Sequence, residues 1–114
     1  MIGQAKLITG IGSIASSFNA FITPSILVFI IPGSKGSGSS GWATMNVNGG
    51  TEPFTYLWTL EQGTSMTISS PTSFQTYFST DSSKGDEQFA VFRCTVTDSF
   101  AVEQFDLIEV EAHI

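Results

Sequence analysis

The sequence has little of what most enzymes and nucleic-acid-binding proteins use. Among 114 residues there are one cysteine, one histidine and four lysine or arginine residues. A single cysteine excludes an intramolecular disulfide and a cysteine-rich metal site, and a single histidine excludes most histidine-based catalysis. Ten acidic residues bring the net charge to −6. Because proteins bind phosphate backbones mainly through lysine and arginine, we expect no nucleic-acid partner.

Charged residues of both signs are scarce. They make up 12% of the chain, whereas soluble domains carry about 25%. Serine, threonine, asparagine, glutamine and glycine must therefore cover much of the surface. Hydrophobic residues at 41% and ten phenylalanines exclude a wholly disordered chain, and the length corresponds to one domain.

The charge is unevenly distributed. Residues 1–50 contain two lysines and no acid, whereas residues 51–114 contain all ten acids. The first part is interrupted by Pro24, by glycines and by hydroxyl residues, so we expect neither a membrane-spanning segment nor a secretion signal. We interpret residues 1–25 as an apolar arm that lies against a partner, and residues 26–114 as the folded domain.

One N-terminal motif matches a cofactor fingerprint. Residues 10–15 read Gly-Ile-Gly-Ser-Ile-Ala, the G-x-G-x-x-A pattern of dinucleotide-binding turns. That chemistry also needs a following helix and an acid about 20 residues later. No acid precedes Glu52, so we expect no cofactor.

Alternation of apolar and polar residues predicts short β-strands, with turns at residues 48–50 and 84–86. Seven strands are expected, at residues 26–31, 43–48, 54–60, 66–68, 74–79, 89–97 and 108–111. Short strands at this spacing favour a β-sandwich. We interpret the Gly/Ser-rich residues 33–41 as a loop between two of its strands. The alternation places five side chains in the core: Met45, Trp58, Phe92, Cys94 and Val96.

Three motifs in order resemble a known family. Residues 48–58, Asn-Gly-Gly-Thr-Glu-Pro-Phe-Thr-Tyr-Leu-Trp, are similar to the Gly-Gly-x-x-Pro-Tyr-x-Tyr-x-Trp segment of PKD-like and phage or bacterial immunoglobulin-like domains. Residues 68–73, Ile-Ser-Ser-Pro-Thr-Ser, and 92–98, Phe-Arg-Cys-Thr-Val-Thr-Asp, follow. The chain thus resembles small immunoglobulin-like domains of bacteriophage structural proteins. The resemblance implies an immunoglobulin-like antiparallel sandwich of about seven strands, with an apolar N-terminal arm.

The sequence departs from that family at two core positions. No cysteine is present on the second strand to pair with Cys94, and Met45 is expected to fill the space instead. Phe92 stands where the tyrosine corner has its tyrosine.

The resemblance implies a non-enzymatic structural protein, assembled in the host cytoplasm and located in the virion. It would be a capsid decoration (cement) protein or a tail-associated accessory protein, with capsid or tail proteins of the same virion as partners and self-association as a further option. We expect a chain lacking residues 1–22 to keep its fold and lose its assembly. Six arm residues are the docking candidates: Ile8, Ile11, Ile14, Phe18, Phe21 and Ile22.

The alternative is a stand-alone PKD-like or carbohydrate-binding module for adhesion to a surface. Its ligand would be a host-surface glycan, and the candidate binding residues are Trp42, Tyr77 and Phe100. Folding of the arm back onto its own domain as a strand would favour this alternative, because no partner would then be needed to bury it.

The remaining reactive side chains are interpreted as structural. Cys94 lies on the apolar side of its strand and is expected to be inert. His113 shares a strand face with Glu109 and Glu111, which we interpret as ordinary acidic surface. Acids in the turns lack the spacing of a calcium loop: Asp81, Asp86, Glu87 and Asp98. We therefore predict no catalytic or metal-binding residue, and no enzyme.

Overall fold

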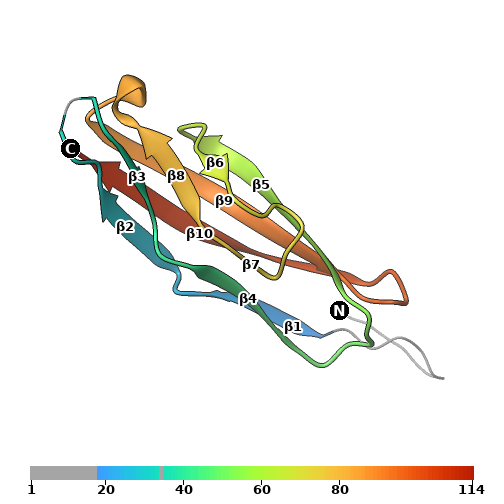
Figure 1. The fold of residues 1–114 in the computed structure, drawn as a ribbon. Coiled ribbons are helices and arrows are strands. Elements are labelled where there is room, and N and C mark those ends of the chain that lie inside the picture. The colour runs from blue at the N-terminus through green and yellow to red at the C-terminus, as the bar shows by residue number, and fades with distance from the viewer. Residues whose placement is uncertain (1–17, 34) are drawn as a thin grey trace.

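The computed structural model describes residues 18–33 and 35–114. These residues form ten β-strands and one 3-10 turn, η1 (Ser82–Lys84), and contain no α-helix. The strands are arranged in two packed layers (Figure 1). The predicted all-β sandwich is confirmed.

One layer is a four-stranded sheet. Its strand order is β2 (Ile26–Ile30), β10 (Glu103–His113), β9 (Glu87–Thr97) and β5 (Thr55–Gly63). β10, β9 and β5 are antiparallel neighbours, in the order of the G, F and C strands of an immunoglobulin sandwich. β9 and β10 pair over eleven residues each.

The other layer consists of two short sheets placed end to end. One has the order β1-β4-β7 and the other β3-β8-β6. The strands are β1 (Asn19–Thr23), β3 (Ser37–Ser39), β4 (Ala43–Asn48), β6 (Thr67–Ile68), β7 (Gln75–Thr76) and β8 (Phe78–Asp81). The chain passes directly from β3 to β4 and from β7 to β8, so the layer is interrupted only at residues 40–42 and at Tyr77.

The N-terminal strands differ from the expectation. β1 lies within the predicted arm, residues 1–25, and pairs antiparallel with β4. Pro24, which has no N–H for a sheet ladder, follows β1. β2 then joins the opposite layer, where it pairs parallel with β10. The prediction of purely antiparallel sheets is wrong for this pair, and the folded domain includes β1, which precedes residue 26.

The core lies between the layers and contains the residues that alternation placed there. Met45, Trp58, Phe92, Cys94 and Val96 are exposed by 2% or less. Phe78, which was not among them, joins two of these side chains: its ring stacks on Phe92 at 4.2 Å and meets Trp58 edge-on at 6.0 Å. The indole Nε1 of Trp58 donates a hydrogen bond of 2.7 Å to the Ser73 carbonyl.

The Gly/Ser-rich segment is more than a loop. Residues Ser37–Ser39 form β3, which pairs with β8. On its other side β3 lies close to β2. Position 38 needs a glycine there, because an added Cβ would lie only 2.7 Å from the Ile30 carbonyl oxygen. The segment therefore packs against β2.

Candidate functional sites

Half of the predicted docking residues can be placed. The other three, Ile8, Ile11 and Ile14, lie outside the described residues. The motif at residues 10–15 lies outside them too. Phe18 and Ile22 are buried, exposed by 5% and 3%, so the prediction that they dock a partner is wrong. They complete the core instead, and the Phe18 ring lies 5.8 Å from that of Phe54. Phe21 points away from the core and is 48% exposed.

Trp42 and Tyr77, two of the candidate ligand-binding residues, lie together. Their rings meet edge-on, with centroids 5.2 Å apart, where both chain segments interrupt the second layer. The backbone of Tyr77 is held by Ser69: the Tyr77 N–H donates to the Ser69 Oγ, and the Ser69 N–H to the Tyr77 carbonyl, each at 3.0 Å. Trp42 is 54% exposed and Tyr77 is half-buried, so the Trp42 side chain is accessible next to a ring whose backbone is held in place.

Phe100 does not join that pair. It lies in the turn between β9 and β10, at the right-hand end of Figure 1, and is 64% exposed. The carboxylate of Asp98 organises this turn by accepting hydrogen bonds from the N–H groups of Phe100, Val102 and Thr51, at 2.9, 3.0 and 3.2 Å. Asp98 thus has a structural role.

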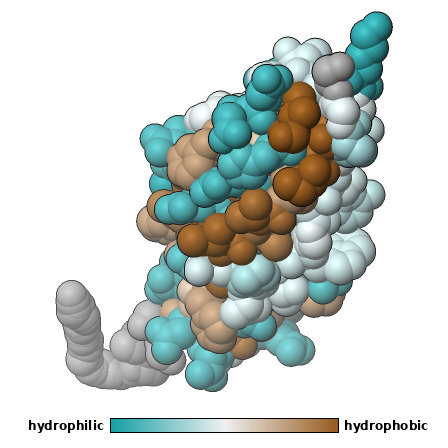
Figure 2. Space-filling model, turned by 90° about the vertical axis from the view of Figure 1, so that its left-hand side faces the viewer, coloured by the Kyte–Doolittle hydropathy of each residue, from teal (hydrophilic) through white to brown (hydrophobic). Residues whose placement is uncertain are grey.

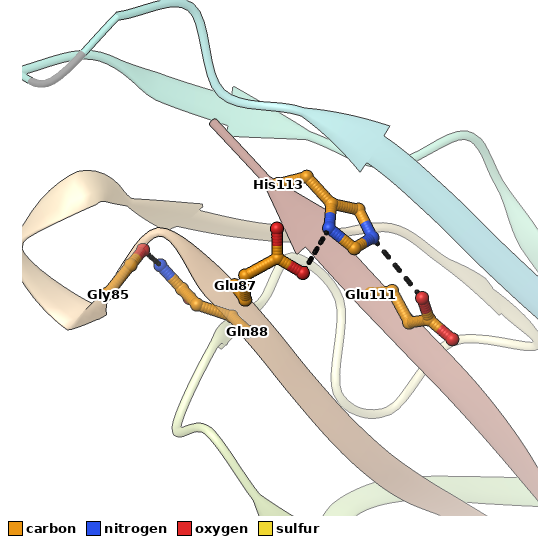
Figure 3. Close-up of polar contacts among 5 residues, drawn as sticks. All are labelled: Gly85, Glu87, Gln88, Glu111 and His113. Carbon is orange, nitrogen blue, oxygen red and sulfur yellow. Dashed lines mark hydrogen bonds and ion pairs between the residues drawn. The ribbon is translucent and has the colours of Figure 1, made fainter.

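His113 lies between two glutamates (Figure 3). Its Nδ1 is 3.0 Å from Glu87 Oε1 and its Nε2 is 3.2 Å from Glu111 Oε1. The hydrogen bond with Glu111, together with that to Glu87, raises the pKa of His113. Strand alternation had suggested Glu109 as the second neighbour; Glu87 takes this place because β9 pairs with β10. Within residues 18–33 and 35–114, no group of three side chains suited to hold a metal ion is found.

Gln88, next to Glu87, is a structural residue that the sequence did not point to. It is only 2% exposed. Its Nε2 donates to the Gly85 carbonyl at 2.9 Å (Figure 3). The same nitrogen donates to the Asp81 carbonyl at 2.8 Å, and the Gln88 Oε1 accepts from Thr80 Oγ1 at 2.8 Å. The side chain therefore holds the η1 turn against β9.

Cys94 is fully buried. Burial raises the pKa of its thiol to about 12. The thiolate, which is the nucleophilic form, is therefore scarce at neutral pH.

A large exposed apolar surface was not predicted. It is formed by the positions of β2, β5, β9 and β10 that point away from the core, and we call it the outer sheet face. It carries seven of the thirteen exposed large hydrophobic side chains in the described residues: Ile26, Val28, Ile30, Leu57, Phe89, Phe105 and Leu107. Figure 2 shows hydrophobic side chains gathered in a band between hydrophilic ones, on the side of the molecule where β2 lies.

The outer sheet face is also acidic. Arg93 is its one arginine; the Arg93 Nε lies 3.0 Å from Glu61 Oε1, and its guanidinium lies 4.1 Å from the centre of the Phe105 ring. Five glutamates project on the same side of the sheet: Glu61, Glu87, Glu103, Glu109 and Glu111. The face therefore combines apolar area with an excess of negative charge.

The sequence predicts which side chains of β10 face outward, but it does not do so for β2. Phe105 and Leu107 alternate with inward residues, so their outward direction follows from the strand period. Residues 26–31 are all apolar, and a uniform run has no alternation from which an exposed side can be identified.

Comparison of the chain with protein-family models finds no match, and comparison with curated proteins finds none either. The part of the chain that the structure describes has no α-helix of the length and hydrophobicity that a membrane crossing requires.

Proposed function

We propose that the chain is a non-enzymatic accessory domain of a bacteriophage virion that attaches to a capsid or tail protein. The outer sheet face supports this most, because seven large hydrophobic side chains are exposed on one side of one sheet. Large exposed apolar areas on soluble domains commonly mark interaction sites. The viral context is supported by the motif resemblance at residues 48–58, 68–73 and 92–98.

The reactive side chains of the described residues support a non-enzymatic role. Cys94 is buried with a raised pKa, Asp98 holds a turn, and His113 bridges two strands. Each therefore has a structural use that accounts for its position.

The arm contributes less to this proposal than the sequence suggested. Because β1 pairs with β4, residues 18–25 are removed from any free arm. The proposal therefore assigns attachment to the folded surface, and Ile8, Ile11 and Ile14 lie outside the described residues.

Binding to particles tests the proposal. The full-length protein is mixed with purified virions whose gene for this chain is disrupted, and binding is measured by co-sedimentation. We expect saturable binding at a fixed copy number per particle. Virions that already carry the protein are the matched control and should bind no more of it. A protein that stays in the supernatant with deficient particles would overturn the proposal.

A second candidate function is a carbohydrate-binding surface module, favoured by the exposed Trp42 ring and its contact with Tyr77. The pairing of β1 with β4 was the observation expected to favour such a self-contained module. Aromatic rings bind the apolar faces of sugar rings, and a fixed support limits the entropy lost on binding. On a glycan array, binding that Trp42→Ala abolishes and Phe100→Ala leaves intact would support this candidate; no binding would reject it.

A further inference from the structure

A hollow of about 540 Å³ lies in the outer sheet face. It is located where the regular pairing of β5 with β9 is broken between Leu60 and Gln62, opposite Val91. The residues that line it come from all four strands and from the segment before β2: Ser25, Ile26, Glu61, Gln62, Val91, Leu107 and Glu109.

The lining combines three apolar side chains, from Ile26, Val91 and Leu107, with the carboxylates of Glu61 and Glu109. Ile26, Glu109 and Val91 lie in one row across β2, β10 and β9. Arg93 donates two hydrogen bonds to the Glu61 carboxylate: Nε to Oε1 at 3.0 Å and Nη2 to Oε2 at 3.3 Å. Within the described residues, the Glu109 carboxylate has no ion pair or hydrogen bond, and its residue is exposed. The hollow thus contains an unpaired carboxylate next to apolar side chains.

We propose that this hollow receives a lysine or arginine side chain of the partner protein. The methylene stem of that side chain would pack on Ile26, Val91 and Leu107, and its cationic group would lie beside Glu109, as long basic side chains do at partly apolar surfaces. Exposed hydrophobic residues around the hollow would exclude water from the contact. The proposal rests on the proposed function in that it names the partner chemistry of the same face.

Charge favours such a partner over a second copy of this chain. The outer sheet face has five glutamates and one arginine, so two such faces in contact would bring like charges together. The whole chain has four basic residues, and Arg93 is already paired on this face. A basic, apolar surface on another protein complements both properties.

A matched pair of peptides tests the hollow directly. The probes are acetyl-Thr-Val-Arg-Val-Thr-amide and the same peptide with citrulline, the neutral analogue of arginine. Each is titrated into the ¹⁵N-labelled full-length protein, and amide shifts are followed by NMR. We expect the arginine peptide to shift the amides of Ile26, Gln62, Val91 and Glu109 saturably, and the citrulline peptide to bind about tenfold more weakly.

Two isosteric variants locate the charge. Glu109→Gln should weaken the arginine peptide about tenfold, whereas Glu103→Gln, on the same face outside the hollow, should leave its affinity unchanged. Thermal unfolding of both variants checks that they are folded. The proposal would be overturned if the two peptides bind equally well, or if Glu109→Gln binds the arginine peptide as tightly as the unaltered protein does. Amide shifts located away from the hollow would overturn it as well.

Binding to deficient virions separates this proposal from the proposed function. Glu109→Lys should bind particles about tenfold more weakly than Glu103→Lys. If the unaltered protein does not bind particles, the proposed function fails while the peptide titration still decides the hollow. If Glu109→Lys binds particles as well as Glu103→Lys does, the hollow is not the docking site although the function stands. A dimer that Leu107→Thr dissociates would reassign the face to a second copy.

Discussion

The carboxylate Oδ2 of Asp106 accepts a hydrogen bond of 2.8 Å from the backbone N–H of Ile22. The two residues are 84 positions apart in the sequence and belong to β10 and β1, which lie in different layers. The bond ties the first described strand to the last. Ile22 and Phe18 are also buried. The hydrogen bond and this burial together make β1 part of the domain.

Replacement of Asp106 by alanine should therefore loosen β1. A part-buried N–H would lose a charged acceptor, which costs about 1.5–3 kcal/mol of unfolding free energy. Urea unfolding followed by circular dichroism measures the loss. Asp86→Ala, which removes an exposed carboxylate, is the matched control and should stay within about 0.5 kcal/mol of the unaltered protein. Equal stability of the two variants would contradict this role of Asp106.

Two N-terminal deletions should behave differently. A chain lacking residues 1–17 keeps every side chain of the described core and should stay folded, with a higher midpoint of thermal unfolding than a chain lacking residues 1–22. A chain lacking residues 1–22 loses the buried Phe18 and Ile22, which contribute roughly 1.5–3 kcal/mol each. The structure thus reverses the expectation that the shorter chain keeps its fold. Equal unfolding midpoints for both deletions would show that β1 adds nothing to stability.

The Cys94 thiol should react only when the chain unfolds. With a pKa of about 12, about one thiol in ten thousand is ionised at pH 8, and the side chain is fully buried. Ellman's reagent at pH 8 should modify the protein completely in concentrated urea and negligibly in buffer. A cysteine introduced at the exposed Ser99 should react at once under both conditions. Rapid modification of the folded, unaltered protein would place Cys94 in an accessible position.

The His113 contacts should make stability depend on pH. Because hydrogen bonds with Glu111 and Glu87 raise the pKa of His113 in the folded state, the protonated form is favoured by folding. This contribution is complete below the unfolded pKa, about 6.5, and is lost as pH rises through the raised folded value. The unaltered protein should thus have a higher midpoint of thermal unfolding than His113→Gln. This difference should be largest near pH 5.5 and decline toward pH 9. A difference that stays constant across this range would argue against the ion pairs.

Much of the core follows from the sequence because side-chain direction is a local property of an extended backbone. Successive residues of a strand point to opposite faces. In β9 this places Phe92, Cys94 and Val96 inward, while Arg93 and Thr95 point outward, as the structure has them. The alternation in β10 similarly directs its glutamates outward.

The candidate surfaces depended on tertiary structure. The all-apolar residues 26–31 do not reveal that β2 is a sheet edge with one side exposed, and nothing local indicates that Trp42 meets Tyr77. The sequence by itself determined the all-β class and the inward residues of the long strands, because both depend on local alternation. Only the tertiary structure decided which strands are neighbours, that β1 is folded in and that the outer sheet face is open. Strand pairing is the result of competition among contacts between residues far apart in the chain.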